Sequence, residues 1–73
     1  MGRRAPHGFA SLTPRELAVC RLVVTGALNK QTAHALGLSV ATVKRHRSSA
    51  MRKLGVRSLP DLVRVMDSSD REA

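Results

Sequence analysis

The sequence has little of what secreted proteins, membrane proteins and enzymes usually need. Its 73 residues include one cysteine, Cys20, and one aromatic residue, Phe9. A single cysteine excludes an internal disulfide and fits a reducing compartment, so we expect a cytoplasmic protein. No apolar run approaches the roughly 20 residues that cross a membrane, so no membrane association is expected. With one aromatic side chain, the core of this single small domain must be aliphatic.

Catalytic and metal-binding constellations are missing as well. The three histidines and Cys20 do not have the spacing of zinc ligands. Glu16 and Asp61 are the only acids before residue 67, so the chain offers no carboxylate pair for general acid–base work. Lys30 lacks the preceding glycine of a phosphate-binding loop. We therefore expect no enzyme, no metal and no cofactor.

Acidic residues are very unevenly distributed in this basic chain, which carries a formal net charge of +8. None of them lies between residues 17 and 60. That segment holds only basic charges: Arg21, Lys30, Lys44, Arg45, Arg47, Arg52, Lys53 and Arg57. A long segment of one charge sign repels itself unless it meets a polyanion. The distribution indicates a nucleic-acid partner, against the alternative of a basic surface without a ligand.

The first predicted helix has a complete start signal. Thr13 is a suitable N-cap, Pro14 fits the first helical position, and Glu16 completes a capping box. The helix is expected to run to about residue 25 and to end at Gly26. Glu16 lies on the apolar face of this helix. We interpret it as the capping-box partner, with the alternative that it is also a buried acceptor for a basic residue of a later helix.

Similar signals delimit three further helices. Asn29, Ser39 and Ser58 are expected as N-caps of helices over 30–36, 40–54 and about 59–66. Gly37 and Gly55 stand where a left-handed residue ends a helix. The sequence thus predicts an all-α four-helix bundle containing a helix-turn-helix over 11–67. Residues 1–10 are expected as a flexible tail or linker remnant, and residues 68–73 as a frayed C-terminus.

The third predicted helix divides into two faces when residues are placed about 100° apart. Its apolar side carries Val40, Val43, Ala50, Met51 and Leu54. The opposite side carries Ala41, Arg45, Ser48 and Arg52, flanked by Lys44 and Ser49. Small side chains allow close approach to a groove, and Lys or Arg can reach guanine edges or phosphates. The pattern predicts that this helix enters the major groove of DNA.

Motifs along the chain resemble, in order and spacing, the C-terminal effector domain of the LuxR/FixJ family of bacterial transcription regulators. They read LTPRE (12–16), GALNKQTA (26–33), LS (38–39), TVKRHR (42–47) and KLGV (53–56). Residues 46–51, 58–60 and 62–64 look most like the FixJ branch of two-component response regulators. The resemblance covers residues 12 to about 66. It implies sequence-specific binding of double-stranded DNA by the output domain of a response regulator.

The resemblance also implies roles for individual positions. The base-reading positions of the family fall at Lys44, Arg45 and Ser48. Positions that hold phosphates match Asn29, Lys30, Thr42 and Arg47, and Arg52 and Lys53 are further candidates. The residues themselves support Asn29 and Lys30, because the start of a helix attracts anions.

A few positions depart from the family pattern or need their own interpretation. Thr32 and Ala50 stand where the family usually has isoleucine, which predicts a smaller core. Cys20 replaces a leucine, and we expect a small buried hydrophobe rather than a redox switch. His46 is expected to pack or to form a hydrogen bond. The stem of Arg47 should pack while its head reaches a phosphate.

The fourth helix has the apolar stripe Leu59, Leu62, Val63 and Met66, with Val65 away from it. The resemblance implies a homodimer through this helix, with Val65 as a candidate contact, bound to an inverted repeat. RNA polymerase is a further candidate partner. The nearest alternative is a sigma-factor region-four-like module that binds promoter DNA and RNA polymerase. The KLGV segment and the fourth helix favour the regulator over that module. A protein-interaction module with an acidic partner is a third possibility.

Overall fold

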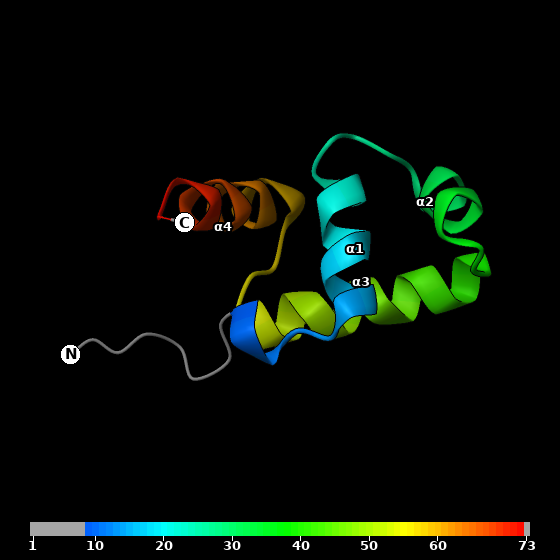
Figure 1. Cartoon of the computed structure of the whole chain (residues 1–73), viewed down its shortest axis with the longest axis horizontal. Coiled ribbons are helices and arrows are strands. Elements are labelled where there is room, and N and C mark those ends of the chain that lie inside the picture. The colour runs from blue at the N-terminus through cyan, green and yellow to red at the C-terminus, as the bar shows by residue number, and fades with distance from the viewer. Residues whose placement is uncertain (1–8, 73) are drawn as a thin grey trace.

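The computed structural model describes the backbone of residues 9–72 and the side chains of residues 9–68. A 3₁₀ turn, η1 (Phe9–Ser11), precedes four helices: α1 (Pro14–Val23), α2 (Asn29–Leu36), α3 (Val40–Leu54) and α4 (Leu59–Glu72) (Figure 1). Every regular element in the described range is helical, so the predicted all-α fold with four helices is confirmed. Of the predicted flexible tail, residues 1–10, the part over residues 1–8 lies outside the described residues.

Helix α1 begins with the predicted capping box. The Thr13 hydroxyl accepts a hydrogen bond from the Glu16 N–H at 3.1 Å, and Glu16 Oε1 accepts one from the Thr13 N–H at 2.9 Å. These bonds satisfy two backbone donors that a helix start leaves without partners. The helix ends at Val23, earlier than predicted, because residues 24–26 already form the turn in which Gly26 has φ of +100°.

Helix α2 begins one residue earlier than predicted. Leu28, not Asn29, holds the N-cap position, and Asn29 is the first helical residue. The side chain of Gln31 explains the shift, because its Oε1 accepts the Leu28 N–H at 2.8 Å. Gly37 ends the helix in the left-handed conformation (φ +68°), as predicted.

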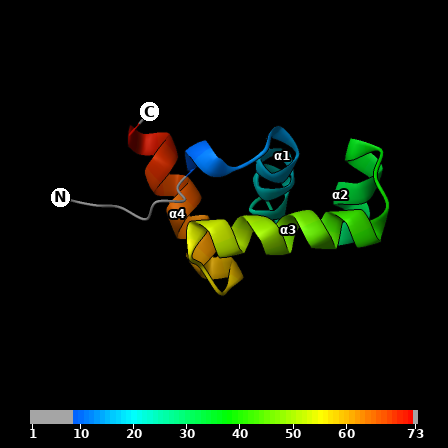
Figure 2. The same ribbon diagram turned by 90° about the horizontal axis from the view of Figure 1, so that it is seen from below.

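Helix α3 has the predicted bounds. Ser39 Oγ accepts the Thr42 N–H at 3.1 Å at its start, and Gly55 closes its end with φ of +72°. The helix passes below α1 and α2 as the long ribbon of Figure 2. The first three helices therefore form the predicted helix-turn-helix, with α3 as its second helix and α1 packed against it.

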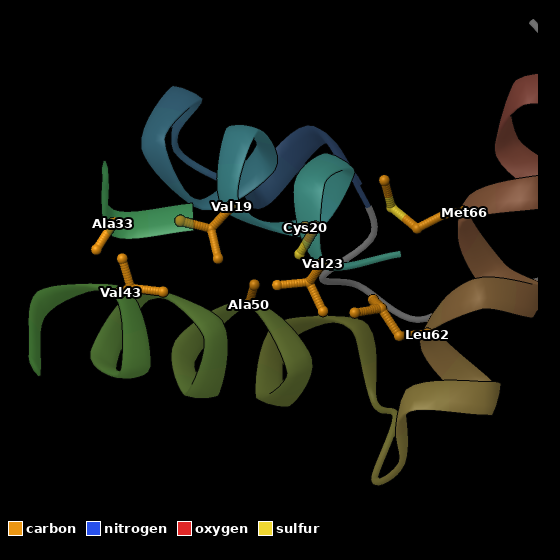
Figure 3. Close-up of a cluster of buried hydrophobic side chains, with 8 residues drawn as sticks. All are labelled: Val19, Cys20, Val23, Ala33, Val43, Ala50, Leu62 and Met66. Carbon is orange, nitrogen blue, oxygen red and sulfur yellow. The ribbon is translucent and has the colours of Figure 1, made fainter. Parts of the chain in front are cut away.

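The core lies between α1 and the other three helices (Figure 3). It is built from aliphatic and small side chains: Val19, Cys20, Val23, Ala33, Val43, Ala50, Leu62 and Met66. Cys20 is fully buried, in agreement with its interpretation as a small hydrophobe. Burial raises the pKa of its thiol, which disfavours the reactive thiolate.

The N-terminal boundary of the packed domain lies earlier than predicted. Phe9 and Ala10 were expected in a tail, yet they belong to η1, and Phe9 packs against the core. The physical reason is the apolar area of an aromatic ring, which gains free energy when it leaves water.

Helix α4 departs most from its prediction. It continues to Glu72, past the expected end near residue 66 and through most of the expected frayed segment 68–73. Only Leu62 and Met66 of the predicted stripe are buried, and Figure 3 shows Leu62 pointing toward Val23. Leu59 and Val63 remain 37% and 41% exposed. Because α4 meets the core along one narrow line, the other half of its stripe faces outward.

Candidate nucleic-acid interface

The outward side of α3 carries the residues that periodicity predicted there. Ala41, Lys44, Arg45, Ser48 and Arg52 are all exposed, at the helical spacing of a single face. Val43 and Ala50 are buried on the opposite side, whereas Val40, expected in the apolar face, is 38% exposed. Val40 is the first residue of the helix. The three proposed base readers, Lys44, Arg45 and Ser48, therefore share one accessible strip.

The electrostatics of this strip follow from its composition. Helices α2 and α3 contain no acidic residue, so Lys44, Arg45 and Arg52 have no carboxylate on α3 itself or on α2. Like charges this close repel one another and attract a polyanion. The strip combines positive charge with the small side chains of Ala41 and Ser48, which leave room for a base-pair edge.

A hydrogen bond across the helix-turn-helix joins two predicted phosphate-binding residues. The guanidinium of Arg47 on α3 donates to Oδ1 of Asn29, the first residue of α2, at 3.2 Å. Both side chains are half-buried, and Lys30 beside them is exposed. The sequence predicted that the Arg47 stem packs, but not that its head contacts Asn29, because no local pattern relates residues 18 positions apart.

Thr42 lies at the start of α3 and belongs to its cap. Its half-buried side chain accepts a hydrogen bond from the Ser39 hydroxyl at 2.9 Å. The Thr42 hydroxyl keeps its own hydrogen as a donor. This hydrogen leaves the hydroxyl able to donate to a phosphate, the role predicted for Thr42, while the residue belongs to the helix cap.

Lys53, predicted as a further phosphate contact, lies in the last turn of α3 and is bound to groups of the protein itself. Its Nζ lies 2.8 Å from Glu16 Oε1 and 3.1 Å from the carbonyl oxygen of Ser11. The side chain of Glu16 is only 6% exposed and that of Lys53 is 28% exposed. The buried carboxylate attracts the ammonium because a charge in the interior needs a partner.

Glu16 thus has both roles that the sequence left open, capping partner and acceptor for a basic residue of a later helix. Burial by itself raises the pKa of its carboxyl. The Lys53 ammonium, the Thr13 N–H and the Ser49 hydroxyl outweigh that effect and lower the pKa from 4.5 to about 2. The carboxylate is therefore charged at neutral pH and holds the last turn of α3 against the start of α1.

His46 is half-buried at the edge of α3. Among residues 9–68, whose side chains the structure describes, no three His, Cys, Asp or Glu side chains lie close enough together to hold a metal ion. No helix in that range has both the length and the apolar character needed to cross a membrane.

A helix-turn-helix with small and basic side chains along its exposed second helix defines a nucleic-acid-binding domain. The model of the family described as "Bacterial regulatory proteins, luxR family" matches residues 10–66. The chain belongs to this family. It is a DNA-binding domain of the kind found in bacterial transcription regulators, and it is not an enzyme. The match favours the regulator over the sigma-factor module.

Individual relatives agree with the family match. The chain is 50% identical over 60 residues to nodulation protein W of Bradyrhizobium diazoefficiens and 52% identical over 61 residues to the response regulator protein TodT of Pseudomonas putida. These alignments cover 82% and 84% of the chain but only 26% and 27% of the relatives. The chain therefore spans about a quarter of the length of these curated relatives.

Solved structures show the same fold. The response regulator StyR superposes with a TM-score of 0.80 at 48% identity, over 82% of this chain and 30% of that one. The response regulator RcsB of Salmonella typhimurium superposes with a TM-score of 0.77 at 35% identity, over 85% of this chain and 30% of that one. The LuxR-type helix-turn-helix fold predicted from the sequence is confirmed.

Proposed function

We propose that the chain binds specific sequences of double-stranded DNA with α3 in the major groove. The observation that carries this proposal is the exposed strip of α3, which combines positive charge with small side chains, while neither α3 nor α2 contains an acidic residue. Lys44, Arg45 and Ser48 read base edges in this arrangement. Lysine and arginine favour guanine, because its major-groove edge offers two acceptors.

Phosphate contacts flank the base readers and fix the orientation of the helix. They are made by Asn29, Lys30, Thr42, Arg47 and Arg52. Lys53 is left out of this set, because its ammonium is bound to Glu16. Phosphate contacts set the register of the protein on DNA, and base contacts select the sequence.

Two measurements test the proposal. A random duplex titrated at increasing salt should show log affinity falling linearly with log salt, because phosphate contacts release counterions. Selection of bound sites from a random duplex library should then yield one preferred motif. Absence of binding at low salt would sink the proposal, and binding without a selected motif would remove its sequence-specific part.

We also propose that two copies dimerise through α4 and bind an inverted repeat. The exposed side chains Leu59 and Val63 lie one helical turn apart and support this surface better than the half-buried Val65. The α3 helices of the two copies would then bind half-sites about one DNA turn apart. Sedimentation on DNA with two half-sites tests the dimer: Leu59→Ser with Val63→Ser should leave one copy bound where the wild type places two.

The relatives named as response regulators support a larger role. We infer that the chain serves as the output domain of a two-component response regulator in the cytoplasm, where bound DNA brings it to RNA polymerase. A receiver domain that covers α3 until it is phosphorylated would make DNA binding conditional. The test compares DNA affinity of the full-length parent with and without phosphorylation, and equal affinities would refute this regulation.

A further inference from the structure

The bond between Arg47 and Asn29 restricts how each side chain can meet DNA. Asn29 stands at the first position of α2, and its Oδ1 accepts from the Arg47 guanidinium of α3 at 3.2 Å. An asparagine side chain whose oxygen is engaged presents its amide N–H groups on the other side. The bond therefore sets the orientation of an amide donor at the start of α2.

Both partners are held before any ligand arrives. Each side chain is half-buried, and the bond spans the two helices of the helix-turn-helix. Groups ordered in advance lose less conformational entropy on binding than free surface side chains do. The guanidinium has further N–H donors, so one bond to Asn29 leaves others available to an anion.

We propose that Arg47 acts as a positioning residue for Asn29, so that the two side chains bind one DNA phosphate as a unit. The inference rests on the proposed DNA binding and deepens it. For such a unit, unlike for two independent contacts, the losses of binding free energy caused by the two single substitutions do not add. Loss of either partner should disable the unit, so that removal of the second partner adds little.

A double-mutant cycle measures this coupling directly. Asn29→Ala and Arg47→Ala should each weaken binding to a random duplex by about tenfold, the effect of one charge-assisted hydrogen bond. The double variant should bind within about twofold of the weaker single variant. In parallel, the NMR signals of the Asn29 side-chain amide should shift in Arg47→Ala, which a contact made by Arg47 alone would not cause.

A matched control uses Arg52, which is exposed on α3, whereas the hydrogen bond to Asn29 comes from Arg47. The losses from Asn29→Ala and Arg52→Ala should multiply, because these side chains act separately. Arg47→Lys tests rescue: the amide signals of Asn29 should return toward their wild-type positions if a lysine donor reaches Oδ1. Thermal melting of every variant confirms that the compared proteins are folded.

The outcomes separate this inference from the proposed function. Multiplying losses for Asn29 and Arg47, with unchanged amide signals, would overturn the inference and leave DNA binding intact. A wild-type protein that fails to bind duplex DNA at low salt would overturn the proposed function itself.

Discussion

The two ends of the exposed basic helix use the same residue type for different purposes. Lys44, near the start of α3, is exposed and has no acid on its own helix. Lys53, in the last turn, is bound to the buried Glu16 and to the Ser11 carbonyl. The difference lies in the neighbour that the fold supplies, because a buried carboxylate captures a cation more strongly than solvent does. One lysine is therefore free for DNA while the other stabilises the domain.

The largest expected effect on stability comes from removing the carboxylate of Glu16 on α1, which pairs with Lys53 in the last turn of α3. Glu16→Ala should lower the free energy of unfolding by about 3 kcal/mol, at the low end for a broken buried pair because Lys53 is partly exposed. Urea unfolding followed by circular dichroism measures it. The matched control is Asp61→Ala, which breaks the exposed pair with Arg64 and should cost less than about 1 kcal/mol. Equal losses for both variants would contradict the comparison.

The same carboxylate predicts a dependence of stability on pH. The pKa of Glu16 is about 2 in the folded state and near 4.5 when the chain unfolds, so its contribution is complete above pH 4.5. It should decline as pH falls toward 2, by about 2–3 kcal/mol in total. Unfolding free energies measured between pH 6 and 2 give this slope. Glu16→Gln should remove most of it, and an unchanged slope would assign the acid sensitivity to other groups.

At the other end of α3, substitution should affect DNA and spare the fold. Arg45→Ala should cost about 1–3 kcal/mol on the preferred site and relax selection at one base pair. Its free energy of unfolding should change by less than about 0.5 kcal/mol, as expected for an exposed position. Anisotropy titrations on preferred and random duplexes measure both effects. An equal loss on the two duplexes would show that Arg45 contacts only phosphate.

The smallest expected effect on the free energy of unfolding comes from a polar residue in the core. Thr32 on α2 is fully buried, and its hydroxyl has no hydrogen-bond partner among the described residues. Thr32→Val keeps the shape and removes the unpaired hydroxyl, so it should raise the free energy of unfolding by about 1 kcal/mol. A higher melting temperature than that of the wild type would show that the substitution stabilises the domain. DNA affinity should stay constant. A loss of affinity would mean that the packing of Thr32 in the core affects the positions of the DNA-binding side chains on α3.

Local chemistry accounts for how much of the fold was predictable. The capping box at Thr13, the N-cap at Ser39 and the left-handed Gly55 each act within one helical turn, so the sequence alone predicts their helix boundaries. Leu28 shows where prediction of a helix boundary from local sequence fails. It has no capping side chain, and the helix starts there because Gln31 reaches back to its N–H.

The candidate site also has features that the sequence predicts and features that depend on helix packing. Periodicity placed Lys44, Arg45 and Ser48 on one exposed face, because a helix determines which residues share a side. It could not show that Arg47 bonds to Asn29, since that contact depends on how α3 packs against α2. The outward half of the α4 stripe, Leu59 and Val63, likewise depends on the line along which α4 meets the core.

The sequence by itself determined the helices, the aliphatic core and the basic strip of α3, because these follow from spacing and side-chain chemistry within a few residues. Only the tertiary structure decided what each charge does. Lys53 is 37 positions from Glu16 along the chain, and packing of α3 on α1 brings their charges to 2.8 Å. Charge interactions depend on distance and burial, and neither can be read from a charge pattern alone.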